Sequence, residues 1–133
     1  MLLSVRERIQ VLGLLPREGN VFLLRMIQET TKAVGFTEKE LKLLNFVTDG
    51  GVTKWKLVAP LYVDVALGEK ARDLVCEKLK ELDKTNKLPL EMLPLHDRLV
   101  EGKESDDLRE FRRARGKVVK LVTQPEAESA AGG

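Results

Sequence analysis

Residues 46–55 read Phe-Val-Thr-Asp-Gly-Gly-Val-Thr-Lys-Trp, and this stretch decides the class of fold. Aromatic and β-branched residues lie on both sides of Gly50-Gly51, and glycines supply the positive φ angles that a tight hairpin turn requires. We therefore predict a β-hairpin here. In residues 61–67, apolar side chains alternate with others at the period of a half-buried strand. The two stretches together predict a small three-stranded antiparallel sheet.

Helical patterns precede and follow these strands. Capping boxes at Ser4/Glu7 and Thr37/Glu40 each predict the start of a helix. Gly35 is expected to end a helix over 21–34 in a left-handed conformation. Further helices are predicted over 37–44, 68–84 and after Pro94. The expected fold is α+β, with four to five short helices packed on the three-stranded sheet.

Apolar residues at helical and strand spacing predict the core. On the first helix, Val5, Ile9 and Leu12 form the expected apolar face. In the rest of the chain, the side chains that we expect to be buried against one another are Leu24, Ile27, Leu41, Trp55, Val63, Leu74, Leu79 and Leu99.

The length and charge of the chain limit which kinds of protein it can be. A chain of 133 residues falls in the single-domain range, and its single cysteine, Cys76, excludes an internal disulfide. Lys and Arg number 23 against 21 Asp and Glu, so no global field attracts nucleic acid or acidic lipid. No apolar run approaches the eighteen or so residues of a membrane span. We expect a cytoplasmic protein with no membrane partner, and the sequence leaves its oligomeric state open.

The last thirty or so residues differ in composition from the rest. We expect a globular domain over 1–102 and a charged C-terminal tail over 103–133, with a helix over 105–115 and a disordered end. Residues 118–122 are apolar enough to add a strand to the sheet or to pair with the sheet of a partner.

No catalytic constellation is visible in the sequence. His96 is the only histidine and is interpreted as an exposed or hydrogen-bonded residue near a helix start. Cys76 lies on the apolar stripe of a helix, and Gly50-Gly51 lies between strands and not before a helix. The sequence therefore predicts no enzyme, no cofactor and no metal site.

The local charge pattern gives the one candidate site. Basic residues outnumber acidic ones between 109 and 120, where only Glu110 is acidic, and several cations so close together can contact phosphates or an acidic protein surface. The alternative is a solvated helix whose charges complement its own dipole. The candidate partner-binding residues are Arg109, Arg112, Arg113, Arg115, Lys117 and Lys120.

Four stretches carry a resemblance to known proteins: residues 15–20, residues 35–41, the hairpin that ends at Trp55, and residues 67–71 with 82–84. In these stretches, and over about residues 11–100, the chain resembles small proteins encoded by tailed bacteriophages, mostly of Gram-positive hosts. The resemblance implies a phage origin and a setting in the host cytoplasm. It carries over no site residues.

Two functions follow as hypotheses. The first is a non-enzymatic protein-binding or assembly factor that contacts a host or phage protein. The second is a small nucleic-acid-binding protein that uses the hairpin and the basic segment 109–120.

Overall fold

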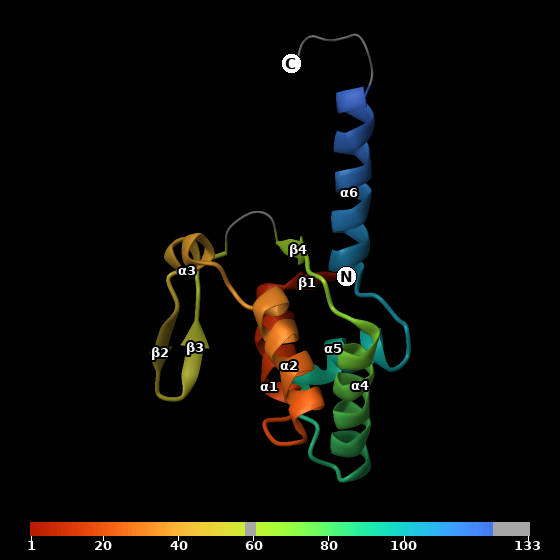
Figure 1. Ribbon diagram of the computed structural model, residues 1–133. Coiled ribbons are helices and arrows are strands. Elements are labelled where there is room, and N and C mark those ends of the chain that lie inside the picture. Colours follow the sequence, from red (N-terminus) through yellow and green to blue (C-terminus); the bar gives the residue numbers. More distant parts are fainter. Residues whose placement is uncertain (58–60, 124–133) are drawn as a thin grey trace.

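The computed structural model is an α+β fold and describes residues 1–57 and 61–123, with side chains as far as residue 114. Within this part the chain forms six α-helices, one 3-10 turn and two small antiparallel sheets (Figure 1). The strands are β1 (Leu2–Ser4), β2 (Val47–Asp49), β3 (Val52–Lys54) and β4 (Tyr62–Asp64). The helices are α1 (Val5–Leu14), α2 (Val21–Val34), α3 (Glu38–Leu44), α4 (Glu69–Lys84), α5 (Leu93–Leu99) and α6 (Asp106–Thr123), with the 3-10 turn η1 (Leu90–Met92) before α5.

The predicted hairpin is confirmed. Strands β2 and β3 pair with Asp49 opposite Val52, and Gly50 and Gly51 make the turn with φ angles of 58° and 79°. Positive φ at both turn residues is what glycine allows without steric cost. In Figure 1 the hairpin stands off from the helical body, with α3 at its upper end.

The predicted three-stranded sheet is wrong. Strand β4 pairs with β1, with Leu3 opposite Val63, and not with the hairpin. The reason is burial. Every residue of β2 and β3 is exposed, so the hairpin has no apolar face to share, whereas Leu2 and Leu3 are both buried.

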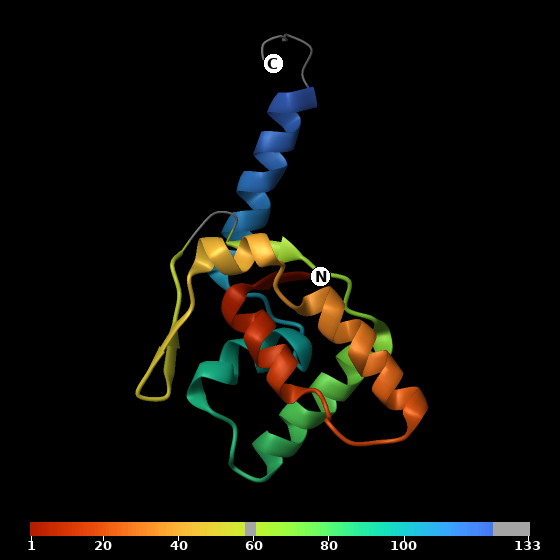
Figure 2. The same ribbon diagram turned by 60° about the vertical axis from the view of Figure 1, so that its left-hand side comes forward.

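The core lies among α1, α2, α4, α5 and the β1–β4 sheet. Figure 2 shows the arrangement of these elements in a view turned by 60°. Of the side chains predicted to be buried, Leu79 and Leu99 are buried, and Ile27, Trp55, Val63 and Leu74 are half-buried. The prediction is wrong for Leu24 and Leu41, which are 38% and 46% exposed. Both are on helices whose apolar stripe is wider than the face that the body covers.

Helix α1 buries a different face from the predicted one. Its buried residues include Glu7, Arg8 and Gln10 beside Val11 and Leu14, and the predicted face at Val5, Ile9 and Leu12 is only half-buried. The polar side chains are tolerated because each has partners: Gln10, for example, donates to the Glu91 carbonyl at 2.9 Å.

Arg8 ties α1 to the end of α2. Its guanidinium donates to the carbonyls of Val34 and Gly35 at 2.9 and 2.6 Å, and to both carboxylate oxygens of Glu40 at 2.7 and 3.0 Å. The Phe36 ring lies 4.1 Å from the guanidinium carbon. Arg8 therefore satisfies carbonyls that the end of a helix leaves without partners.

Gly35 does end α2, but not in the predicted left-handed conformation, since its φ is −64°. A Cβ atom at this position would lie 2.7 Å from the Thr31 carbonyl oxygen. Glycine is therefore required here for the close approach of backbone atoms and not for positive φ.

Helix α6 is longer than predicted and contacts the body. It continues past residue 115 to Thr123, so residues 118–122 are helical in the structure and add no strand to either sheet. Leu108, in its first turns, is completely buried, and Ser105 Oγ accepts a hydrogen bond from the Leu108 amide at 3.2 Å. These contacts attach the start of α6 to the body. The predicted disordered end beyond residue 123 lies outside the described residues.

Within residues 1–57 and 61–123, none of the helices combines the length and the apolar character needed to cross a lipid bilayer.

Candidate functional site

An apolar groove lies where α6, the β1–β4 sheet and the base of the hairpin meet. Its volume is about 590 Å³, within the range of sites that hold a ligand or a few side chains of a partner. The large apolar side chains of its lining come from α3, the hairpin base, β4 and α6; they are Leu44, Trp55, Leu57, Leu61, Tyr62 and Phe111.

One wall is held by a row of aromatic rings. The rings of Phe36 and Phe46 have centroids 5.2 Å apart in an edge-to-face arrangement, and the centroid of Phe46 lies 5.9 Å from that of Trp55. Such contacts stabilise beyond the area that they bury. The backbone amide of Lys56 also donates to the Leu44 carbonyl at 2.8 Å. The exposed hairpin therefore has a fixed base, and Trp55 is held at the groove.

The opposite wall is formed by the start of α6 against β4. The rings of Tyr62 and Phe111 lie with centroids 5.2 Å apart. Leu108, one helical turn before Phe111, is completely buried and fixes the helix against the body. The rest of α6 projects away from the body in both ribbon views (Figures 1 and 2).

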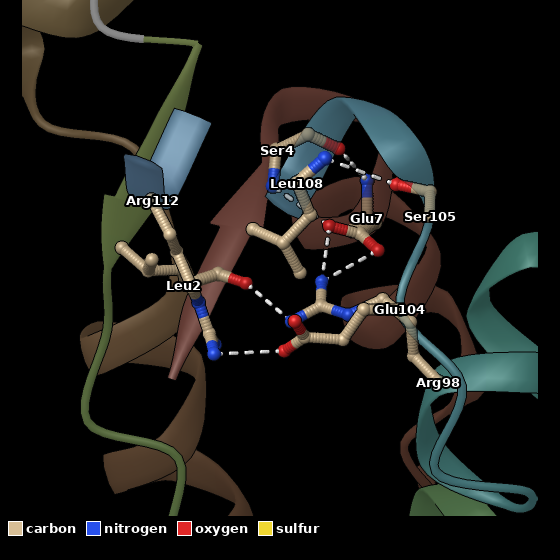
Figure 3. A network of polar contacts seen from close by, with 8 residues as sticks. All are labelled: Leu2, Ser4, Glu7, Arg98, Glu104, Ser105, Leu108 and Arg112. Atoms are coloured by element: carbon tan, nitrogen blue, oxygen red, sulfur yellow. Dashed lines mark hydrogen bonds and ion pairs between the residues drawn. The ribbon is translucent and has the colours of Figure 1, made fainter. Parts of the chain in front are cut away.

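A buried polar network supports this wall from beneath (Figure 3). Glu7 closes the capping box of α1 with Ser4 and accepts from Arg98, which also donates to the Leu2 carbonyl at 2.8 Å. Beside this network, Arg112 of α6 pairs with Glu104 at 2.9 Å. The network joins β1, α1 and α5, the elements on which α6 rests.

Two basic and two acidic side chains line the groove. Arg6 lies over the Trp55 ring, with its guanidinium carbon 6.0 Å from the ring centroid. Among the residues that the structure describes, neither Arg6 nor Lys56 forms an ion pair. Of the two acidic lining residues, Glu110 is paired with Arg113 at 3.0 Å, and Asp107 lies at the positive end of the α6 dipole. The groove therefore combines apolar walls with two cations, Arg6 and Lys56, and two carboxylates.

The predicted basic cluster lies on α6, but its described side chains have acidic partners. Arg109 pairs with Asp106, Arg112 with Glu104 and Arg113 with Glu110. None of these three arginines lines the groove. The side chains of the other candidates, Arg115, Lys117 and Lys120, lie outside the part of the chain whose side chains are described.

The groove itself is missed by sequence reasoning. Trp55 is predicted to be a core residue, and Leu57 and Leu61 are not predicted to meet Phe111 of the tail. The available signal is the spacing of Leu108 and Phe111, which places two bulky apolar residues on one side of an otherwise charged helix.

Cys76 and His96 lie in or near the core. Cys76 is half-buried, its thiol donates to the Leu99 carbonyl at 3.3 Å, and burial raises the pKa of that thiol, so it is held in its less reactive protonated form. His96, interpreted from the sequence as exposed or hydrogen-bonded, is buried, because α5 turns it toward the body, and its Nδ1 atom has no hydrogen-bond partner among the described residues.

Comparisons of the chain with protein-family models, with curated proteins and with solved structures found no match.

Proposed function

We propose that this chain is a non-enzymatic protein-binding factor, and that the groove between α6 and the hairpin base receives an apolar segment of a partner protein that also carries acidic residues. The observation that carries the proposal is the combination of apolar walls with two cations, Arg6 and Lys56, that have no ion-pair partner in the described part of the chain. Charges of opposite sign on a partner give specificity and faster association.

The exposed leucines of the groove supply the expected binding energy. Leu57 and Leu61 are 83% and 53% exposed, and both line the groove beside Trp55. Burying such a side chain completely is worth about 1.5–3 kcal/mol. Clustered exposed apolar side chains with a charged rim are typical of interaction sites.

The proposed setting is the cytoplasm of a phage-infected cell, where the chain contacts a host or phage protein. The resemblance over about residues 11–100 supports this setting. The non-enzymatic part of the proposal is supported by the sequence, which shows no catalytic constellation around its single histidine and single cysteine.

Nucleic-acid binding receives less support from the arginines. Arg109, Arg112 and Arg113 each have a carboxylate within ion-pairing distance, which reduces the positive field that a phosphate backbone would meet. Exposed ion pairs are weak, so these side chains can still exchange partners.

A matched pair of variants tests protein binding by the groove in the cells where the chain naturally occurs. Leu57→Asp changes the groove, and Leu90→Asp changes an equally exposed leucine that does not line it, the two being 83% and 82% exposed. The proposal expects one protein to be recovered with the wild type and with Leu90→Asp and lost with Leu57→Asp. Equal recovery with both variants would remove the groove from the proposal.

A further inference from the structure

His96 has an unusual environment away from the groove. The residue lies on α5 and is only 8% exposed, and its Nδ1 atom is buried without a hydrogen-bond partner among the described residues. A buried polar atom without a partner costs free energy, so each such atom calls for an explanation such as a bound water or ion.

The end of α5 brings two carboxylates to this imidazole. Asp97 Oδ1 lies 3.8 Å from His96 Nδ1. Gly102 has a φ of 70°, and the Lys103 amide donates back to the Asp97 carbonyl at 2.8 Å. This turn at the helix end folds the chain back and places Glu101 beside the pair. One ligand atom from each of His96, Asp97 and Glu101 lies within 4.8 Å of the others.

We propose that His96, Asp97 and Glu101 bind a divalent transition-metal cation of the Zn²⁺ class. A neutral imidazole and two carboxylates are ligands that this class prefers, and the two negative charges offset those of the ion. The buried Nδ1 would then have the partner that it lacks. Mg²⁺ is excluded from the proposal, because it prefers oxygen ligands and retains its waters.

To bind the ion, only the two carboxylate side chains have to move closer to the imidazole. Bonds of about 2.0–2.2 Å at tetrahedral angles place neighbouring ligand atoms roughly 3.3–3.6 Å apart. Asp97 is half-buried and Glu101 is exposed, so their side chains can close on the fixed imidazole. Lys103 is the competitor: its ammonium lies 3.4 Å from Glu101.

The single histidine makes the test direct. The imidazole resonances in an NMR spectrum of the folded full chain belong to His96 alone, since no other histidine is present. Titration with Zn²⁺ should shift or broaden them and raise the melting temperature, and Mg²⁺ at the same concentration should do neither. Lys103→Ala removes the competing charge and should lower the Zn²⁺ concentration needed for half the shift.

Three variants test whether Zn²⁺ binds at His96 through the two carboxylates and not through the Cys76 thiol. Asp97→Asn and Glu101→Gln should each raise the Zn²⁺ concentration needed for half of the His96 shift at least tenfold. Both should leave the rest of the spectrum unchanged. Cys76→Ser should not change the Zn²⁺ concentration needed for half of the His96 shift, because the proposed ligands do not include the thiol. The proposal is overturned if the His96 resonances do not respond to Zn²⁺, if both carboxylate variants respond like the wild type, or if Cys76→Ser abolishes the response.

Discussion

Arg98 Nη1 lies 2.6 and 2.7 Å from the two carboxylate oxygens of Glu7, across 91 residues of sequence. Both side chains are buried, and the other terminal nitrogen of Arg98 donates to the Leu2 carbonyl. This contact fastens α5 to the start of α1 and to β1. It lies beneath the wall that α6 contributes to the groove (Figure 3).

Removing one partner of this pair should destabilise the fold strongly. Arg98→Met leaves the Glu7 carboxylate buried without its counter-ion, and such changes cost about 3–5 kcal/mol. Urea unfolding followed by circular dichroism measures the free energy of unfolding. The double variant Glu7→Gln/Arg98→Met should lose less than the sum of the two single changes. A loss below about 1 kcal/mol for Arg98→Met would show that the pair is not needed.

Truncation tests where the folded domain ends. Deleting 103–133 removes Leu108 and Phe111, and we expect a clear fall in melting temperature, because Leu108→Ala alone should cost about 2–5 kcal/mol. Deleting 115–133 keeps both residues and should change stability little. If residues 1–102 alone are as stable as the full chain, the boundary lies at Gly102, where the change in composition predicts it.

Glu40 should make stability depend on pH. The Arg8 guanidinium, which donates to this carboxylate, lowers the pKa of Glu40 from its ordinary 4.5 to about 2. The folded protein then binds this proton less readily than the unfolded chain, so the stabilisation is complete above about pH 4.5 and is lost as the pH falls toward 2. Glu40→Gln should be less stable than the wild type at pH 6, and the difference should shrink below pH 4.5. A difference that stays constant from pH 6 to pH 2 would contradict this account.

Two glycines should respond in opposite directions to the same change. Gly35→Ala places a Cβ atom against the Thr31 carbonyl oxygen and should destabilise the fold. Gly13→Ala, within α1, meets nothing within 4 Å and should stabilise it by up to about 1 kcal/mol, since alanine is the better helix former. Thermal unfolding of both variants measures the difference, and a neutral Gly35→Ala would mean that the backbone there can relax.

Local signals in the sequence predict local structure well in this chain. Both capping boxes form as predicted, with Ser4 accepting from the Glu7 amide and Thr37 from the Glu40 amide. The hairpin turn also forms at Gly50-Gly51. Each of these features depends on residues only a few positions apart, so the sequence contains all that decides them.

Features that depend on distant residues were not predictable in the same way. Strand β1 is three residues long and gains its place only by pairing with β4, sixty residues later. The burial of Arg8 and Glu7 depends on partners on α3 and α5. The groove likewise forms only when Phe111 of α6 reaches Tyr62 of β4. Periodicity identifies apolar faces, but it does not say which element covers them.

The most direct test of the proposed function uses Trp55, the only tryptophan, which lines the groove. Peptides selected from a random library against the folded chain are titrated into it while Trp55 fluorescence is recorded. We predict that the selected peptides combine bulky apolar residues with Asp or Glu and shift the emission to shorter wavelength. The shift should persist in Leu90→Asp and in the triple variant Arg109→Ala/Arg112→Ala/Arg113→Ala, and it should be lost in Leu57→Asp. Unchanged emission at saturation, or equal affinity for Leu57→Asp, would contradict binding in the groove.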